Sequence, residues 1–435
     1  MLHIQSGKEP FMKLIKLSAI AIALFFIVYI FYPQQQELSS DIEDINNLAP
    51  ALMVEAAIPG MAVAKVENGE IVFTGVYGDA DIHKDRTVTK DTLFNIASIS
   101  KPIMGLVLMQ LVDQNKLELD SDINNYLPFK VDNPNIENET ITLRHLASHS
   151  SGIADYYDAQ SYGINQDTET TLEQHLRSLI IPEGKLYNNG ERFLNYAPGT
   201  KRRYSNLGAG LAGQLVEAVT GETLAEYSER HLFKQLGMTN TSWLLHDLNL
   251  DEIAVPYEVE QCIPWLFICA ISEEVELNYV INEFVAPPRS YKSLIPYPHF
   301  GNPQYPDGGI RTSISQLSSF LTQVLTNRDV SGEPILSDEN YNEMFKLQLA
   351  PEVSDSQRFF WRDRGGLTGH MGSDLGVATS MYFDISTQTG FIILFNRGLD
   401  ESSGRAMNRL AEVLMATTFS ENKTTQRNPK EASNL

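Results

Sequence analysis

The sequence predicts an α/β (α+β) fold in which one central antiparallel sheet, built from both chain ends, is flanked by helices and joined to an all-helical lobe. Three observations support this. The early stretch "GMAVAKVENGEIVFTGVYG" is rich in β-formers, the middle is mostly helical, and "GVATSMYFD" and "TGFIILFNRG" return late. Strands at both ends of a chain with helices between them favour one shared sheet.

The first strands are expected to form a hairpin. Its two β-rich runs meet at Asn68-Gly69, a pair that adopts positive backbone angles and suits a tight turn. The domain therefore opens with an antiparallel pair.

The helical segments have identifiable ends. Lys101 to Leu111 is apolar almost all round, as in a helix buried between layers, and Pro102 fits if it lies in the first turn. The helix in "GAGLAGQLVEAVTG" is closed by Gly221.

Two later helices complete the pattern. A capping box, with Ser313 as cap and Gln316 reaching back, opens "SISQLSSFLTQVL". A last helix is predicted around Arg405 to Thr418, before a polar tail.

The N-terminal segment differs from the rest of the chain. Lys13 and Lys16 precede an apolar run from Leu17 to Tyr32, which is typical of an export signal or anchor. An uncleaved anchor is favoured because no small-residue cleavage pattern follows the run; a cleaved signal and a buried helix are the alternatives. The expected location is periplasmic or extracytoplasmic, with a membrane tether.

These observations divide the chain into segments. Residues 1–33 are the signal or anchor, 34–46 a linker, 47–419 the folded domain with a helical lobe at about 98–330, and 420–435 a disordered tail. The formal net charge of −22 makes nucleic acid a poor partner.

Only two cysteines occur, Cys262 and Cys269, inside the apolar stretch "QCIPWLFICAIS". A disulfide and two buried free thiols both remain open, whereas no nearby histidine completes a zinc site. The run from Cys262 to Ile271 could form a wall of the substrate cleft, an ordinary buried element or a membrane-contacting patch.

A nucleophile is predicted in "FNIASISKPIMG". Residues three apart share a helix face, so Ser98 and Lys101 would bring hydroxyl and amine together near the positive end of a helix. A partly desolvated lysine can take the proton of a serine hydroxyl. Ser100, one residue before the lysine, points elsewhere.

Two further motifs accompany this pair: Tyr204-Ser205-Asn206, and His370-Met371-Gly372 before a predicted strand. With them the chain resembles the serine β-lactamase and penicillin-binding family, in the branch of class C β-lactamases, DD-peptidases and esterases, from about residue 47 to about residue 419. The connecting stretches that extend the resemblance are "DTLFNIASISK", "LASHSSGI", "APGTKRRYSNLG", "QLGMTNT", "YPDGGIRTS" and "GHMGSDLGVATSMYFD".

The resemblance implies a β-lactamase/transpeptidase-like fold and roles for single residues. Ser98 is the expected nucleophile, Lys101 its base and Tyr204 the proton shuttle to the leaving group. Asn206 would orient substrate, and the backbone N–H groups of Ser98 and Ser373 would form the oxyanion hole. His370 and Gly372 would contribute to substrate binding.

The third motif departs from the Lys-Thr pair that holds a substrate carboxylate in β-lactamases. Met371 cannot donate a hydrogen bond, and His370 is expected to be neutral at pH 7 and to gain a proton near pH 5.5. We therefore predict an exported serine hydrolase that cleaves a small ester or amide, with substrates lacking a carboxylate favoured. Alternatives are a DD-peptidase or β-lactamase, and a silent penicillin-binding scaffold or sensor.

No cofactor or metal is expected. His145 and His149 have the spacing of two ligands on one helix face, but no carboxylate completes a metal motif. His149 is instead expected to make fixed hydrogen bonds near the site.

Overall fold

The computed structural model describes residues 45–156, 161–263, 268–271, 294–416 and 423–426, and the described elements belong to one compact unit. The apolar N-terminal segment, the linker up to residue 44 and most of the tail lie outside these ranges. Among the described helices, none has the length and apolar character needed to cross a bilayer.

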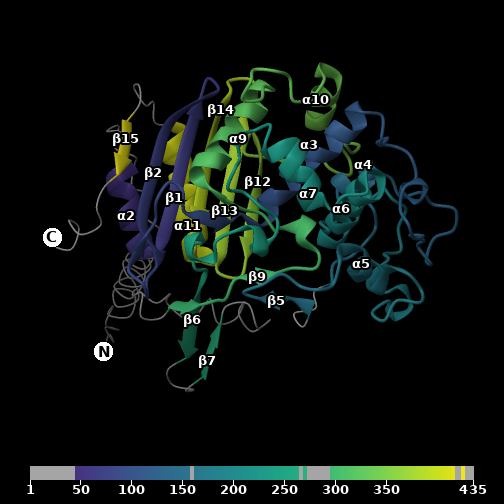
Figure 1. Cartoon of the computed structure of the whole chain (residues 1–435), viewed down its shortest axis with the longest axis horizontal. Coiled ribbons are helices and arrows are strands. Elements are labelled where there is room, and N and C mark those ends of the chain that lie inside the picture. The colour runs from purple at the N-terminus through teal and green to yellow at the C-terminus, as the bar shows by residue number, and fades with distance from the viewer. Residues whose placement is uncertain (1–44, 157–160, 264–267, 272–293, 417–422, 427–435) are drawn as a thin grey trace, which may run out of the picture. The chain divides into compact units, whose positions relative to one another are not determined.

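A single large sheet organises the fold (Figure 1). Its strands run in the order β11-β12-β13-β14-β1-β2-β15, and β3 (Arg86–Thr87) pairs with β2. The bounds are β1 Gly60–Glu67, β2 Glu70–Asp81, β11 Arg362–Arg364, β12 Leu367–Asp374, β13 Val377–Asp384, β14 Thr389–Phe395 and β15 Lys423–Gln426.

The two ends of the chain meet in the middle of this sheet. Strand β1 pairs antiparallel with β14, with Val63 opposite Ile393. On its other edge β1 pairs with β2 through the predicted hairpin, where Asn68 and Gly69 have φ angles of 52° and 74°. The shared sheet and its opening turn are confirmed.

One part of the tail was predicted wrongly. Lys423–Gln426 forms strand β15, which pairs parallel with β2, so this part of the expected disordered segment 420–435 carries regular structure. An edge strand such as β2 offers unpaired backbone groups that a short extended segment can bind.

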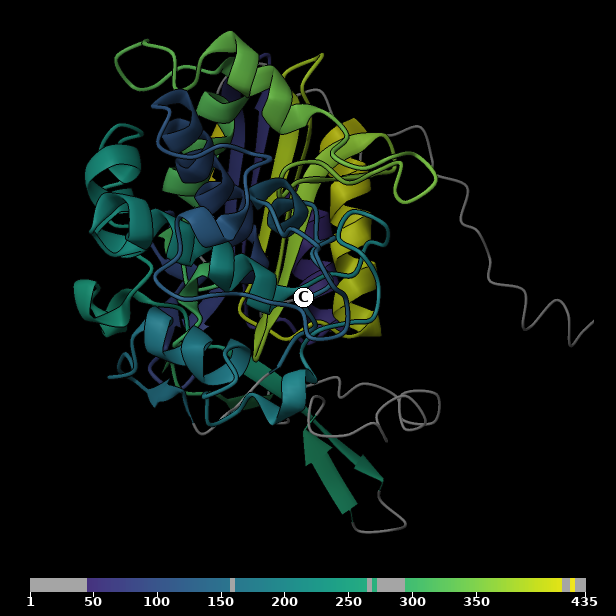
Figure 2. The same ribbon diagram turned by 90° about the vertical axis from the view of Figure 1, so that its right-hand side faces the viewer.

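Alternate residues of the central strands enter two different cores, because successive side chains in a strand point to opposite faces. Met61 and Val63 pack with α2 (Ile45–Glu55) and α11 (Glu401–Ala416). Ala62 and Ala64 belong to the larger core on the other face, with α9 (Ile314–Thr326). Figure 2 shows the yellow helix α11 on one side of the sheet and the green, blue and teal helices on the other.

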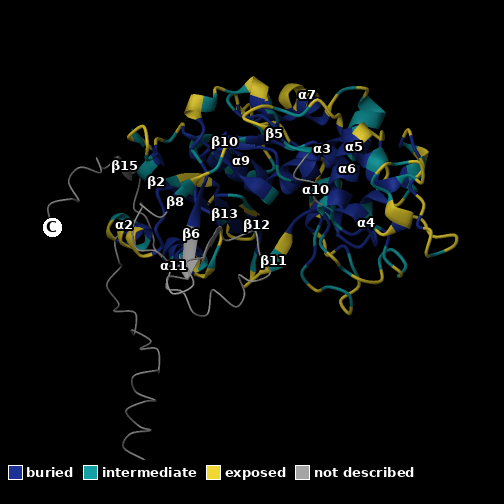
Figure 3. Cartoon of the chain, turned by 90° about the horizontal axis from the view of Figure 1, so that it is seen from below, coloured by how far each residue is buried: buried dark blue, intermediate teal, exposed yellow. Residues whose placement is uncertain are grey.

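Helix α3 (Ser100–Asp113) lies at the centre of the larger core. Twelve of its fourteen residues are buried, Pro102 sits in its first turn as predicted, and it appears dark blue in Figure 3. The other helices on this side are α4 Leu143–Ala147, α5 Leu172–Ile180, α6 Asn206–Thr220, α7 Leu224–Ser228 and α10 Asp338–Phe345. Helix α6 ends at Gly221 as expected.

The segment 98–330 is not an all-helical lobe. It contains the three-stranded sheet β7-β6-β8, and α9 at its end covers the main sheet instead. Two-stranded ribbons also fall in or beside it. These strands are β4 Leu93–Asn95 with β10 Arg311–Ser313, β5 Gly163–Ile164 with β9 Phe300–Gly301, and β6 Tyr257–Ile263, β7 Ile268–Ile271 and β8 Leu294–Pro296.

The backbone register of β6 and β7 places Cys262 opposite Cys269. Residues 264–267, at the centre of the run for which a cleft wall, a buried element and a membrane-contacting patch were left open, lie outside the described residues.

The capping of α9 is half as predicted. The hydroxyl of Ser313 accepts from the backbone N–H of Gln316 at 3.3 Å. The side chain of Gln316 does not reach back to the cap; it bonds to the backbone N–H of Asn240 at 3.0 Å and to Thr241. The Gln316 amide therefore fastens α9 to a neighbouring loop.

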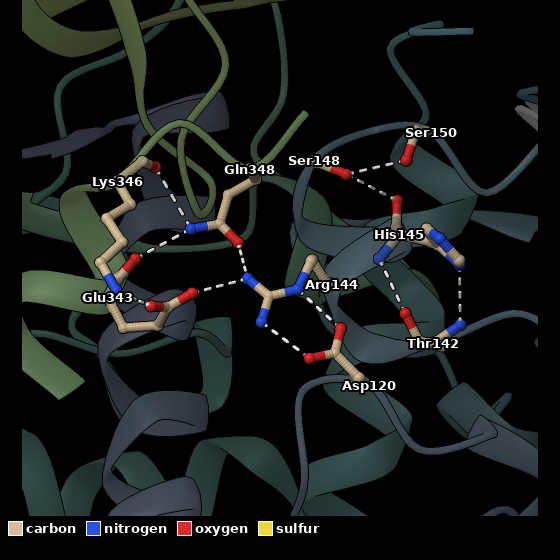
Figure 4. Close-up of polar contacts among 9 residues, drawn as sticks. All are labelled: Asp120, Thr142, Arg144, His145, Ser148, Ser150, Glu343, Lys346 and Gln348. Atoms are coloured by element: carbon tan, nitrogen blue, oxygen red, sulfur yellow. Dashed lines mark hydrogen bonds and ion pairs between the residues drawn. The ribbon is translucent and has the colours of Figure 1, made fainter. Parts of the chain in front are cut away.

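Arg144 connects three separate segments near the start of α4 (Figure 4). Its guanidinium donates to both oxygens of Asp120, at 2.6 and 2.9 Å, to Glu343 of α10 at 2.7 Å, and to Gln348. His145, beside it, accepts from the backbone N–H of Thr142 at 3.2 Å and completes the N-terminal cap of α4. Helix α4 is thereby fixed in place just before His149.

Candidate active site

Ser98 lies in a single 3₁₀ turn, η1 (Ala97–Ile99), immediately before α3. Its hydroxyl oxygen is 2.9 Å from Nζ of Lys101 and 2.9 Å from the hydroxyl of Tyr204. Lys101 is fully buried, whereas Ser98 is partly exposed. The sequence-predicted nucleophile, base and proton shuttle therefore converge on one oxygen atom.

The turn that carries Ser98 has an unusual backbone. Ala97 has a φ of 46°, a left-handed conformation that costs free energy for a residue with a Cβ and persists only where the surroundings enforce it. Its N–H donates to Asn95 at 2.7 Å, and the carbonyl of Ile96 accepts from Thr379 at 2.9 Å. Strands β4 and β13 thus hold the nucleophile turn in its geometry.

Lys101 has a second fixed partner. Its Nζ also donates to the backbone carbonyl of Asp307, at the end of the short 3₁₀ turn η10 (Tyr305–Asp307). The Asp307 carboxyl accepts from Asn302 at 3.0 Å and from Gln304 at 2.8 Å. Burial raises the pKa of this carboxyl to about 7, although the nearby Lys101 opposes the rise.

Tyr204 is packed against His149, with ring centroids 4.3 Å apart. Nδ1 of His149 accepts from the backbone N–H of Ser205 at 3.2 Å, which confirms the expected hydrogen bonding near the site. Burial, reinforced by the charge of Lys101, holds the pKa of His149 well below its usual value. Its neutral ring therefore supports the loop that presents Tyr204.

His145 and His149 do not share a helix face. Helix α4 ends at Ala147, and His149 has a φ of 54° outside it. Each imidazole makes its own hydrogen bond, His145 to Thr142 and His149 to Ser205.

Asn206 is the first residue of α6 and lines the pocket beside Ser98. Its side-chain amide donates to Asp155 at 3.1 Å, and the same carboxylate accepts from the backbone N–H of Leu207 at 3.1 Å. Asp155, which sequence reasoning missed, therefore orients Asn206 while satisfying the helix terminus.

The third motif lies on strand β12 and, as predicted, precedes a strand, β13. His370 is only 9% exposed, its Nδ1 is 2.5 Å from the carbonyl oxygen of Met371, and its ring centroid is 6.1 Å from that of Tyr204. Burial and then the charge of Lys101 lower its pKa to about 3. The expectation that His370 becomes cationic near pH 5.5 is therefore wrong.

Gly372 brings β12 against the nucleophile turn. A Cβ at this position would lie 2.3 Å from Oγ1 of Thr379 and 2.4 Å from the carbonyl oxygen of Ile96, so only glycine permits the approach. Ser373 follows on the same strand and is exposed toward the pocket. The oxyanion-hole role of the Ser98 and Ser373 N–H groups stays a prediction.

These residues surround a pocket of about 530 Å³. Besides the predicted residues Ser98, Tyr204, Asn206, His370, Gly372 and Ser373, it is lined by residues that sequence reasoning did not single out. These are Arg202, Gln357, Arg362, Asp363, Arg364 and Tyr382, and Met371 of the third motif also lines the pocket. A signal for Arg202 was present in "APGTKRRYSNLG", where two arginines precede Tyr204. No sequence motif marked the residues of β11 as pocket residues.

The sheet, the helical side and the convergence of Ser98, Lys101 and Tyr204 define a protein of β-lactamase/transpeptidase-like fold with a serine-lysine-tyrosine site. The family model described as Beta-lactamase matches residues 45–415. The chain belongs to this Beta-lactamase family.

Relatives agree with this assignment. The chain is 26% identical over 272 residues to Protein flp of Staphylococcus aureus (strain MRSA252), which covers 59% of this chain and 51% of flp. It is 29% identical over 221 residues to Esterase EstB of Burkholderia gladioli, covering 48% of this chain and 53% of EstB. The chain thus spans about half the length of these relatives.

Solved structures show the same fold. The octameric penicillin-binding protein homologue from Pyrococcus abyssi superimposes with a TM-score of 0.61 at 20% identity, covering 86% of this chain and 78% of that one. EstCE1, described as a hydrolase with promiscuous acyltransferase activity, gives a TM-score of 0.61 at 19% identity, covering 85% of this chain and 97% of its own.

Proposed function

We propose that this protein is a serine hydrolase that cleaves a small ester or amide through an acyl-enzyme on Ser98. The observation that carries the proposal is the pair of 2.9 Å contacts from Lys101 and Tyr204 to the Ser98 hydroxyl, at the wall of an open pocket. A nucleophile needs a base within hydrogen-bond reach, and this arrangement supplies one.

In the proposed reaction, Lys101 takes the proton of Ser98 as Oγ forms a bond to the acyl carbon. Tyr204, whose hydroxyl contacts the same oxygen, gives its proton to the leaving oxygen or nitrogen as the bond to the acyl carbon breaks, and the proton held by Lys101 restores the Tyr204 hydroxyl. Water then hydrolyses the acyl-enzyme. The hydrogen bond from Lys101 to the Asp307 carbonyl keeps Nζ aimed at Ser98 throughout.

The name of the EstB relative agrees with an ester substrate. A DD-peptidase or β-lactamase and a catalytically silent scaffold stay as alternatives. We further propose an extracytoplasmic location with a membrane tether, which rests on the sequence of residues 1–33 alone. Protease treatment of cells whose cytoplasmic membrane is intact tests the location: the chain should be cleaved while a cytoplasmic marker protein is protected, and cleavage only after lysis would contradict it.

Fluorophosphonate labelling followed by peptide mass mapping tests the nucleophile. One adduct on Ser98 is expected, and Ser98→Ala should abolish it. Ser100→Ala is the neighbouring control, because the Ser100 hydroxyl is buried and accepts from the backbone N–H of Ile310 at 3.1 Å. An adduct on Ser100, or labelling that survives Ser98→Ala, would overturn the assignment.

Burst kinetics with a chromogenic ester separate turnover from silence. A hydrolase should show a burst followed by steady turnover, since acylation and deacylation are separate steps. A burst without turnover would instead indicate the silent scaffold.

A further inference from the structure

The pocket next to Ser98 is rich in cationic side chains, although the chain as a whole carries a formal charge of −22. Arg202, Arg362 and Arg364 all line it. In the described part of the chain, none of the three forms an ion pair with a carboxylate. Guanidinium groups without an anionic partner, gathered in a concave site, are suited to a negatively charged ligand.

Among the residues that the structure describes, the one carboxylate lining the pocket, that of Asp363, is already neutralised. Asp363 accepts from Arg358 through both oxygens, at 2.6 and 2.7 Å, and from Thr368 at 2.8 Å. Because this bidentate pair consumes the negative charge of Asp363, the charge left facing the pocket is that of the three arginines.

The arginines are oriented by neutral groups. Nε of Arg202 donates to the side-chain carbonyl of Gln357 at 2.6 Å, and Gln357 is itself fixed by backbone carbonyls at 2.8 and 3.1 Å. Arg364 donates to the sulfur of Met371 at 2.7 Å, and a thioether is a weak acceptor. Neutral partners set the direction of these guanidiniums without cancelling their charge.

The positive charges of these arginines also repel one another. Burial and then the neighbouring charge of Arg362 lower the pKa of Arg202. Arg362 and Arg364 are alternate residues of β11, which places them on the same face of that strand. A bound anion would relieve this repulsion, whereas His370, with a pKa of about 3, contributes no charge at neutral pH.

We propose that Arg202, Arg362 and Arg364 form an oxyanion-binding subsite, so that the preferred substrates are esters bearing a carboxylate or phosphate group. The inference rests on the proposed hydrolase function and names its substrate class. The third motif had suggested substrates without a carboxylate, and the proposal reverses this expectation. Arg362 and Arg364 of β11, and Arg202 in the loop before Tyr204, supply the positive charge that His370 lacks.

Matched ester pairs test the subsite. 4-Nitrophenyl hydrogen glutarate is compared with 4-nitrophenyl pentanoate, which places the charge in the acyl part. The 3-carboxyphenyl and phenyl butanoates place it in the leaving group. In Arg362→Gln, the ratio of kcat/KM for the anionic ester to that for the neutral ester should fall about tenfold in at least one pair. This is the loss expected for one charge-assisted hydrogen bond.

Arg230→Gln is the charge-matched control. Arg230 is 61% exposed and pairs with Glu222, away from the pocket lining. The anionic-to-neutral ratio should stay at the wild-type value in this variant. Raising sodium chloride from about 0.05 to about 0.5 M should lower kcat/KM for the anionic ester more than for the neutral one, because salt screens attraction to the arginines.

The outcomes separate this inference from the proposed function. If Ser98-dependent hydrolysis occurs but Arg362→Gln leaves both ratios at wild type, the subsite is refuted and the hydrolase stands. If neither ester is hydrolysed, calorimetry with Ser98→Ala still tests the subsite: glutarate or inorganic phosphate should bind and should bind about tenfold more weakly after Arg362→Gln. The stronger of the two ligands distinguishes carboxylate from phosphate, and binding of neither refutes the subsite.

Discussion

The backbone carbonyl of Asp307 accepts a hydrogen bond from Nζ of Lys101, a residue 206 positions earlier in the chain. This contact joins the buried helix α3 to the turn η10 directly behind the nucleophile. The Asp307 side chain, in turn, is held by Asn302 and Gln304. The base of the proposed reaction therefore depends on a loop that also contains a titrating carboxyl group.

Asp307→Asn should change how stability depends on pH. The folded pKa of about 7 lies above the ordinary 3.8, so between these values the folded state holds a proton that the unfolded state has lost. This carboxyl therefore makes wild type less stable as pH rises, by up to about 1.4 kcal/mol per pH unit. The free energy of unfolding of both proteins is measured with urea at pH 5 and pH 7.5. Relative to wild type, that of the variant should be higher at pH 7.5 than at pH 5.

In Asp307→Asn, the side-chain NH2 would also face one of the two amide groups, those of Asn302 and Gln304, that donate to the carboxyl. The stability lost in this way does not vary with pH. The pH-dependent part is thus the informative readout. An identical difference between the two proteins at both pH values would show that the Asp307 carboxyl is ionised in the folded state throughout this range.

His370→Gln should act in the opposite direction. The folded pKa of about 3 lies below the ordinary 6.5, so the unfolded state takes up a proton first as pH falls below 6.5. Wild type should then lose about 2 kcal/mol through this residue between pH 6.5 and pH 5, and the variant should not. Free energies of unfolding of both proteins at pH 7 and pH 5 measure this loss of stability. Equal pH dependence in the two proteins would place the His370 pKa near its ordinary value.

Gly372→Ala should damage the site more than the fold. The added Cβ would meet Oγ1 of Thr379 and the carbonyl of Ile96, both below 2.5 Å, and would push β12 away from the turn that carries Ser98. Overpacking of this kind costs about 1–3 kcal/mol, and small displacements of a nucleophile reduce rates by about 100-fold. Fluorophosphonate labelling rates and urea unfolding give the two values.

Gly404→Ala in α11 is the control for this substitution, because its added Cβ would have only an ordinary contact, with Leu399 at 3.8 Å. It should label at the wild-type rate and gain slightly in stability from the better helix former. If Gly372→Ala also labels at the wild-type rate, β12 does not set the position of Ser98.

Arg144→Gln should destabilise the fold by about 1–3 kcal/mol, because Glu343, whose side chain is 19% exposed, loses its arginine donor and keeps only the ion pair with Lys346, and Gln348 loses its donor too. Only part of this loss comes from Asp120, whose side chain is 70% exposed and is screened by water. The matched change Arg230→Gln breaks an exposed pair and should cost under about 0.5 kcal/mol. Denaturant midpoints of the two variants give the comparison, and equal losses would mean that Arg144 contributes no more than a surface ion pair.

The sequence revealed those features whose cause is local or periodic. Asn68-Gly69 specified its turn, Gly221 its helix end, and the spacing of Ser98 and Lys101 their convergence, because each depends on neighbours within a few positions. Tyr204 was found through a motif that matches a known family, and it does reach the Ser98 hydroxyl.

Features that depend on distant segments were missed. Gln316 could satisfy the capping pattern, yet its amide bonds to Asn240, 76 positions away. The pKa of His370 follows from burial by strands and loops that no local pattern specifies. The arginines of β11 enter the pocket only because β11 pairs with β12, with Arg362 opposite Gly369. Side-chain chemistry was readable from the sequence, whereas its surroundings depended on the tertiary fold.

The pairing of β1 with β14 also bears on how the chain is synthesised. While a ribosome is still adding the helical segments, β1 and β2 have only each other, and the partner of β1 on its other edge has yet to be made. The two halves of the main sheet are therefore joined by one pairing of very large sequence separation, β1 with β14, which slows folding and leaves apolar strand edges exposed to aggregation in the meantime. Nascent chains stalled before β13 should remain protease-sensitive and should engage chaperones, and protection should appear only after β14 has left the exit tunnel.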